Sequence, residues 1–205
     1  LVISATEFEI EPFLSENIVT DVLITGVGSH ATTFQVTKKL MQNNYDLVIQ
    51  AGIAGSFNNK FDKANVVVVE KETFGDFGIY EKGNFKTMFE TGLVDKNDFP
   101  FKNGWLVNEH DNFLQAGLPR ANGITVNTIT DDPKKIKELQ EKFDPDIESM
   151  EGAAFHYICL LMKVGFLQLR SISNFVGERD KGKWNIKDSV TNLNIELKNL
   201  IRNLI

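Results

Sequence analysis

The chain has 205 residues, a formal net charge of −6 and a single cysteine, Cys159. This length is most economically one domain over 1–205, with room for a sizeable core. The negative charge argues against a nucleic-acid partner, which needs a basic face to neutralise phosphates. No apolar run reaches the roughly 18 residues of a membrane span, so no membrane partner is expected. One cysteine cannot form an internal disulfide, which favours a cytoplasmic location.

The chain opens directly in a predicted strand over 1–5, so we expect further residues to precede it, and nothing in it resembles a signal peptide. A polar turn over 6–12 follows and carries three acids, Glu7, Glu9 and Glu11. Such a cluster is typical of a solvated helix start. The alternative is that one acid points into a cleft, and the residues alone leave both interpretations open.

Two glycine-rich turns end the next two predicted strands, at 26–28 after strand 21–25 and at 52–55 after strand 46–51. The third glycine of a dinucleotide fingerprint is absent, and no acid ends strand 46–51, so we reject NAD binding. Glycines at these places still let a ligand approach the backbone closely. The helix after the first turn is expected to bury four apolar residues, namely Ala31, Phe34, Leu40 and Met41.

The middle of the chain contains its strongest strand signal, the continuous β-branched run over 66–69. An irregular, aromatic-rich stretch over 74–101 follows, of a length typical of lids and binding loops. A satellite core or a subunit contact is favoured over a ligand pocket for these aromatic residues. A strand over 124–128 and a Lys/Glu-rich surface helix near 133–143 come next.

The last third of the chain carries the strongest functional signal. A strand ends where an apolar helix begins at Gly152, and Glu151 lies in the first turn, where the helix dipole favours negative charge. The buried strand predicted over 166–172 delivers Asn174 to the same edge. Open α/β sheets bind ligands beyond the carboxyl ends of their strands. A sugar-and-base recognition pair and a plain helix cap with a turn residue are both compatible with this pattern.

The alternation of strands and helices predicts an α/β fold with a largely parallel sheet and helices on both faces. A charged loop over 175–184 leads to a C-terminal helix with an apolar stripe, formed by Ile186, Val190, Leu193, Leu197 and Leu200. The three histidines, His30, His110 and His156, have no partners at metal-ligand spacing, so neither a metal nor a cofactor is expected. His156 and Cys159 lie in an apolar helical segment and are interpreted as interior residues.

Four segments, taken together, resemble the nucleoside phosphorylase and nucleosidase superfamily, which includes the purine nucleoside phosphorylases and the methylthioadenosine nucleosidases. They are 5–9, 25–28, 52–55, and 149–151 with 170–174, in the order of that family. The resemblance implies a three-layer α/β/α sandwich around a mixed, largely parallel twisted sheet. It also implies a homodimer or a higher homo-oligomer.

The resemblance also implies roles for residues of this chain. Glu151 would hold the ribose hydroxyls while Met150 packs against the sugar, and Glu9 would activate water. Asn174 would address the leaving nitrogen of the base. Arg170 would support Glu151, or else act as a structural cation at the strand end. The remaining substrate contacts implied by the matched segments are Ile53 and Ser173.

Two departures from the family pattern narrow the substrate and the reaction. Nucleosidases acting on adenine compounds carry an aspartate where this chain has Asn174, and a neutral amide suits a 6-oxopurine better. Phosphorylases of the group carry an arginine where this chain has Gln50, which favours hydrolysis. The chain is thus most similar to the futalosine hydrolase branch, which releases hypoxanthine from futalosine in menaquinone biosynthesis. Arg179 would then meet the carboxylate of the 5′ substituent.

Three other functions stay open at this point. A methylthioadenosine/S-adenosylhomocysteine-type nucleosidase is disfavoured by Asn174, and a phosphorylase is disfavoured by Gln50. A non-catalytic nucleoside-binding module is disfavoured because binding alone requires no acid such as Glu9 at the water position. In each case the expected partner is a small nucleoside.

Overall fold

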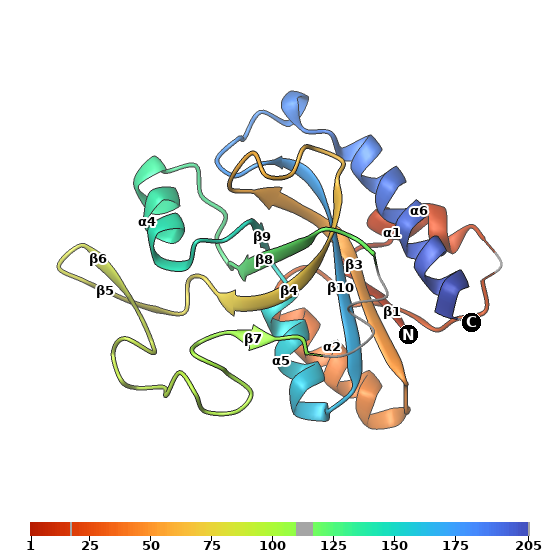
Figure 1. The fold of residues 1–205 in the computed structure, drawn as a ribbon, viewed down its shortest axis with the longest axis horizontal. Coiled ribbons are helices and arrows are strands. Elements are labelled where there is room, and N and C mark those ends of the chain that lie inside the picture. Colours follow the sequence, from red (N-terminus) through yellow and green to blue (C-terminus); the bar gives the residue numbers. More distant parts are fainter. Residues whose placement is uncertain (17, 110–116, 205) are drawn as a thin grey trace.

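The computed structural model describes residues 1–16, 18–109 and 117–204, in which a large mixed sheet is flanked by helices (Figure 1). In order of pairing the sheet runs β10-β4-β8-β9-β3-β1-β2, with β7 beside β4. Its strands are β1 (Val2–Ser4), β2 (Val22–Ile24), β3 (Leu47–Ser56), β4 (Val66–Phe74), β7 (Leu106–Val107), β8 (Arg120–Thr125), β9 (Ile147–Ser149) and β10 (Gly165–Phe175). The β-branched run over 66–69 is buried in β4, as predicted.

The sheet closes on itself, because β10 pairs in parallel with β3 and antiparallel with β4. The circuit is completed by β8, which pairs in parallel with β4 and β9, and by the antiparallel pair of β9 and β3. The predicted α/β fold with a mixed sheet is confirmed, but the sheet is barrel-like rather than the open, largely parallel layer of a sandwich. Irregularities at Ile172–Asn174 in β10 and at Val69–Lys71 in β4 bend these strands toward closure.

Two pairs of helices cover opposite sides of the sheet (Figure 1). On one side α1 (Glu7–Leu14) packs against α6 (Ile186–Leu204), and the apolar stripe of α6 enters the largest core cluster. On the other side α2 (Ser29–Gln42) packs against α5 (Gly152–Met162). Both His156 and Cys159 are fully buried in α5, as expected. In the described part of the chain, every helix is too short or too polar to cross a bilayer.

The predicted apolar face of α2 is wrong at two positions. Phe34 and Met41 are 64% and 75% exposed, while the helix buries Thr32, Val36 and Leu40. The buried residues recur every fourth position, so the face against α5 is made of small and branched side chains that allow close packing. The two large apolar residues are left on the outside.

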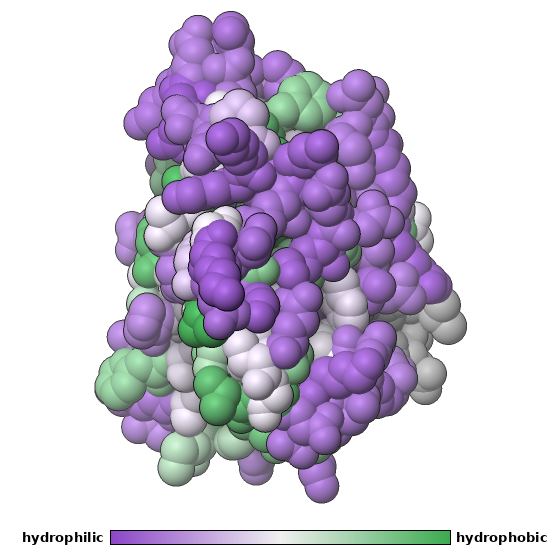
Figure 2. Space-filling model, turned by 90° about the vertical axis from the view of Figure 1, so that its left-hand side faces the viewer, coloured by the Kyte–Doolittle hydropathy of each residue, from purple (hydrophilic) through white to green (hydrophobic). Residues whose placement is uncertain are grey.

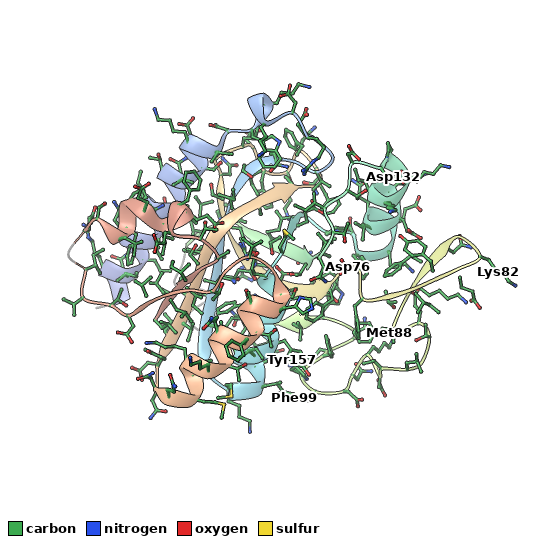
Figure 3. The ribbon with its side chains drawn as sticks, turned by 180° about the vertical axis from the view of Figure 1, so that it is seen from behind. Asp76, Lys82, Met88, Phe99, Asp132 and Tyr157 are labelled. Carbon is green, nitrogen blue, oxygen red and sulfur yellow. The ribbon has the colours of Figure 1, made fainter. Side chains whose placement is uncertain are left out.

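The aromatic stretch over 74–101 contains a hairpin, formed by β5 (Gly78–Glu81) and β6 (Asn84–Thr87). Lys82 lies at its tip, away from the body of the molecule (Figure 3). The hairpin packs near α4 (Pro133–Phe143), and this face is mostly hydrophilic (Figure 2). Phe89 and Phe101 stack edge to face in a small core against α5, so the expected satellite core is present.

Candidate active site

A cavity of about 250 Å³ lies where several strands of the sheet end. Its wall is drawn from the segments that follow β1, β2 and β8, and from the ends of β3, β9 and β10. Seven of the eight predicted site residues line it, and they are Glu9, Ile53, Met150, Glu151, Ser173, Asn174 and Arg179. Further lining residues include Phe8, Val126, Glu148 and Trp184. The structure therefore brings together side chains from both ends of the chain.

Glu9 is buried on the cavity wall, whereas Glu7 and Glu11 on the same segment are exposed. The segment is α1 rather than the predicted turn, and of the two interpretations the cleft-directed acid is right for Glu9. Its Oε2 accepts hydrogen bonds from the Thr6 hydroxyl at 2.8 Å and from the Thr6 backbone N–H at 3.1 Å. Its Oε1 accepts from the backbone N–H of Ile53 at 3.0 Å. These donors fix the carboxylate in one orientation.

The helix that carries Glu9 is kinked, with a non-helical backbone at Ile10 and a proline at Pro12. The buried amide of Asn194 in α6 lies in the gap, where it donates to the Glu9 carbonyl at 2.8 Å and accepts from the Phe13 N–H at 3.0 Å. In a regular helix those two backbone groups would bond each other. The inserted amide therefore sets the direction in which α1 presents Glu9.

Glu151 precedes α5 and is 5% exposed. Its Oε1 accepts the backbone N–H of Gly28 at 2.9 Å. Gly28 has a φ of +95°, which is easily adopted by glycine, so this residue type lets the turn aim its N–H at the carboxylate. The Gly28 N–H at this helix start is thus bonded to Glu151.

Arg170, which the sequence also predicts as a site residue, is not among the residues that line the cavity. It is 1% exposed and lies behind the wall, where its Nη2 is 3.5 Å from Glu151 Oε2 and 3.1 Å from Gln50 Oε1. The expected support of Glu151 by Arg170 is present. Gln50 is buried as the partner of Arg170, so its side chain also lies outside the cavity.

Asn174 is partly buried at the end of β10, and its amide is oriented by its neighbours. The Ser173 hydroxyl donates to Asn174 Oδ1 at 2.7 Å, and Asn174 Nδ2 donates to the Phe175 carbonyl at 3.0 Å. An amide has two N–H hydrogens and two acceptor positions on its oxygen. One donor and one acceptor position of the amide therefore remain beyond these two hydrogen bonds.

Glu148 is a site residue that the sequence interpretation missed. It is 6% exposed, lines the cavity, and its Oε2 has no hydrogen-bond partner in the described part of the chain. Burial raises the pKa of its carboxyl to about 7, against the opposing attraction of Arg179. The signal that could have found it is its spacing, three residues before Glu151 on a strand that ends at the site.

Arg179 and Trp184 come from the loop after β10 and line the same cavity. The Arg179 guanidinium lies 5.9 Å from the centroid of the Trp184 ring, and the indole N–H donates to the Glu178 carbonyl at 2.9 Å. A half-buried tryptophan offers a flat apolar surface suited to an aromatic base. The described residues that line the cavity include one cation, Arg179.

A buried polar cluster lies beneath the site. Burial raises the pKa of Glu72 to about 7, and its carboxyl accepts from Gln168 at 2.9 Å and from Thr125 at 3.2 Å. The Thr125 hydroxyl also accepts the backbone N–H of Ala153 at 2.7 Å, which anchors the first turn of α5 behind Glu151. Sequence reasoning did not identify this cluster.

The histidines lie apart from the site. Fully buried His156 places its Nδ1 3.1 Å from the Leu106 carbonyl, its Nε2 has no partner among the described residues, and burial lowers its pKa to about 3. His30 is exposed on α2, and His110 lies outside the described residues. Within 1–16, 18–109 and 117–204, no group of three or more histidine, cysteine or acidic side chains is arranged to hold a metal ion.

Residues 17–205 match the sequence model of the phosphorylase superfamily, so the chain belongs to that family. Within it the chain is similar to futalosine hydrolases. It is 29% identical to the futalosine hydrolase of Thermus thermophilus, over 87% of this chain and 80% of that protein. It is 31% identical to the futalosine hydrolase of Acidothermus cellulolyticus, over 84% and 71% respectively.

The chain is also similar to 5′-methylthioadenosine/S-adenosylhomocysteine nucleosidases. The 5′-methylthioadenosine/S-adenosylhomocysteine nucleosidase of Maridesulfovibrio salexigens is 28% identical over 76% of this chain and 68% of that protein. Among solved structures, native futalosine hydrolase of Helicobacter pylori superimposes with a TM-score of 0.81 at 16% identity, covering 98% and 96% of the two chains. The nucleosidase of Neisseria meningitidis, in complex with methylthio-immucillin-A, gives 0.81 at 16% identity over 98% and 97%. At these identities the structural likeness concerns the fold.

Proposed function

We propose that this protein hydrolyses the N-glycosidic bond of a 6-oxopurine nucleoside, and that it converts futalosine to hypoxanthine and dehypoxanthinyl futalosine. The observation that carries this function is one small cavity whose lining includes the buried carboxyl groups of Glu9 and Glu151 and the neutral amide of Asn174. Similarity to two curated futalosine hydrolases over most of the chain supports the same substrate.

Cleavage of an N-glycosidic bond builds positive charge on the sugar and negative charge on the base, as in the oxocarbenium-like transition state of glycosidases. Glu151 holds the ribose hydroxyls and stabilises the sugar cation, and Arg170 positions Glu151 from behind. Met150 packs against the sugar. The fixed carboxylate of Glu9 orients the attacking water and removes its proton.

At the other end of the substrate, Asn174 donates a hydrogen bond to the departing base and thereby stabilises its negative charge. Ser173 holds the amide of Asn174 in this orientation, at 2.7 Å. Ile53 contributes its side chain to the cavity wall and its N–H to Glu9. Arg179 binds the carboxylate of the 5′ substituent.

A methylthioadenosine/S-adenosylhomocysteine-type nucleosidase is the second candidate, supported by the similar nucleosidases. Against it stands Asn174, because an amide cannot donate a proton to adenine as an aspartic acid can. A phosphorylase has less support, because two groups that could bind phosphate have other partners. Gln50 is buried against Arg170, and the Gly28 N–H donates to Glu151. A non-catalytic binding module would need no Glu9 in the cavity.

The test is to incubate the protein with futalosine, inosine and methylthioadenosine, with and without phosphate, and to identify the released base and sugar. We expect hypoxanthine and a free sugar at the same rate with and without phosphate. Formation of a sugar 1-phosphate in the presence of phosphate would identify a phosphorylase. Preferential release of adenine from methylthioadenosine would identify a methylthioadenosine/S-adenosylhomocysteine-type nucleosidase. If no base is released from any of the three nucleosides, the protein is a non-catalytic nucleoside-binding module.

We also propose that residues 1–205 act as one domain and assemble as a homodimer or a higher homo-oligomer in the cytoplasm. The single domain is supported by the cavity, whose wall combines Glu9 near the start with Trp184 near the end. The oligomer is supported by the outer face of α2, where exposed Phe34 and Met41 border a groove of about 810 Å³. The cytoplasm is supported by Cys159, which is buried and unbridged.

A further inference from the structure

Three neighbouring strands place Glu148, Gly55 and Asn174 side by side. Gly55 of β3 is in register with Asn174 of β10 on one side and with Glu148 of β9 on the other. Residues paired across a ladder point to the same face of a sheet. Accordingly, a Cβ added at Gly55 would lie 3.4 Å from Asn174 Nδ2 and 3.5 Å from Glu148 Cγ. The bare backbone of Gly55 thus forms the floor of a slot between an amide and a carboxyl group.

The carboxyl group in this slot lacks a partner of its own. The Oε2 atom of Glu148 has no hydrogen-bond partner in the described part of the chain, and the residue is 6% exposed, so water is largely excluded as a partner. A buried, unsatisfied polar atom costs stability, and such an atom on a cavity wall points to a ligand that supplies the missing partner. Arg179 lines the same cavity, and its charge favours the ionised form of this carboxyl.

We propose that Glu148 is the residue that selects the base, by accepting a hydrogen bond from the ring N–H of a 6-oxopurine while Asn174 donates to an acceptor of the same base. This inference rests on the proposed function and deepens it. A 6-oxopurine carries a hydrogen on the ring nitrogen next to its carbonyl group, and that hydrogen is a donor for the carboxylate. Above its pKa of about 7 Glu148 is ionised, and the lone pair that adenine carries on that nitrogen would then face its negative charge. The slot therefore rejects adenine by repulsion as well as by a lost hydrogen bond.

The test measures the binding of free hypoxanthine and free adenine by titration calorimetry, so that it is independent of catalysis. We expect the unaltered protein to prefer hypoxanthine. Glu148→Gln keeps the size of the side chain but removes its charge, and an amide can either accept or donate. It should weaken hypoxanthine binding by about 10- to 100-fold and bring the two affinities close together. Glu148→Ala should also abolish the preference.

Asp146→Asn is the matched control, because Asp146 lies two residues away, is equally buried, and bonds Lys60 and Asn122 outside the cavity. The Asp146→Asn protein should prefer hypoxanthine over adenine as strongly as the unaltered protein does. The melting temperature of each variant shows whether it is folded. A preference that survives Glu148→Gln would overturn the inference. So would an unchanged preference with a loss of turnover alone, which would instead make Glu148 a proton donor.

The futalosine assay separates this inference from the proposed function. If the unaltered protein releases no hypoxanthine from futalosine but loses its base preference in Glu148→Gln, the hydrolase proposal fails and the recognition role stands. If it releases hypoxanthine and Glu148→Gln keeps the preference, the hydrolase proposal stands and the recognition role fails.

Discussion

Gly28 donates its backbone N–H to Glu151 Oε1 at 2.9 Å across 123 residues of sequence. This bond joins the first glycine turn to the start of α5, and it uses an N–H group that a phosphate would otherwise need. The same carboxylate meets Arg170 from inside the sheet. Glu151 is therefore positioned from two directions. In the proposed mechanism this preorganisation stabilises the developing sugar cation.

Glu9→Gln should lower kcat for futalosine by about 10²- to 10⁴-fold, because it removes the proposed general base while keeping the shape of the side chain. Hypoxanthine release in steady state measures this effect. Glu11→Gln is the control, since it changes an exposed acid of the same helix and should leave kcat unchanged. Near-full turnover in Glu9→Gln would exclude the general-base role.

Glu151→Gln should lower kcat/KM for nucleosides by about 10- to 100-fold, because it weakens a charge-assisted hydrogen bond to the ribose. Comparing inosine with its 2′- and 3′-deoxy analogues assigns the effect. The unaltered enzyme should lose activity when a hydroxyl is removed, and the variant should lose much less. Equal losses for both proteins would show that Glu151 does not contact the sugar hydroxyls.

Asn174→Asp should shift activity from futalosine toward methylthioadenosine. An aspartic acid can supply a proton to adenine, and a positioned acid contributes about 10²-fold or more in rate. The ratio of the two kcat/KM values is the measurement. Asn174→Ala serves as the comparison, since it removes the amide without adding an acid and should lower both activities. A ratio that is the same in Asn174→Asp as in the unaltered enzyme would contradict the assignment.

Arg179→Ala should lower kcat/KM for futalosine by about 10-fold more than kcat/KM for inosine, because inosine lacks the 5′ carboxylate. Lys181→Ala changes another exposed cation of the same loop and should affect neither substrate. An equal loss on both substrates would remove the 5′-carboxylate role. That result would instead indicate that Arg179 acts at the base end, through its attraction to Glu148.

His156 should make the fold sensitive to acid. Burial lowers its pKa from 6.5 to about 3, so its stabilising contribution is complete above about pH 6.5 and falls as the pH drops toward the folded value. Between about pH 8 and pH 5 the loss from this residue is about 2 kcal/mol. Urea unfolding of the unaltered protein and of His156→Gln at both pH values measures the difference.

Other groups act in the opposite direction over part of that range. The raised pKa values of Glu72 and Glu148 make their contribution less favourable as the pH rises from about 4.5 to 7. Both carboxyls are present in the unaltered protein and in His156→Gln, so the difference between the two isolates the histidine. An identical pH dependence of the two unfolding free energies would contradict the prediction.

The sequence predicted the edge at which the site forms because polar residues there interrupt strongly apolar strands. Glu151 and Asn174 follow such strands, and both line the cavity. Glu148 is not identified from the sequence because it lies in a three-residue strand directly after Ile147, where a polar residue next to an apolar one is typical of an ordinary solvent-facing position. Only the pairing of β9 with β3 turns that position toward the cavity.

The closure of the sheet and the outer face of α2 depend on tertiary structure. Local periodicity identifies strands, but it identifies neither the register shift at Ile172–Asn174 nor the pairing of β10 with both β3 and β4. For α2, Phe34 and Met41 follow a helical spacing, yet the helix buries Val36 and Leu40 against α5 instead. Hydrophobicity alone cannot decide which of two available stripes a neighbouring helix will cover.

The amide of Asn194, inserted into the backbone of α1, also bears on how the enzyme is made. This side chain bonds the Glu9 carbonyl and the Phe13 N–H, yet it is separated from them by more than 180 residues, with sequence distances of 185 and 181. A ribosome synthesises Glu9 early and Asn194 late. The direction of Glu9, the proposed general base, therefore depends on a contact that can form only after both ends of the chain have been synthesised.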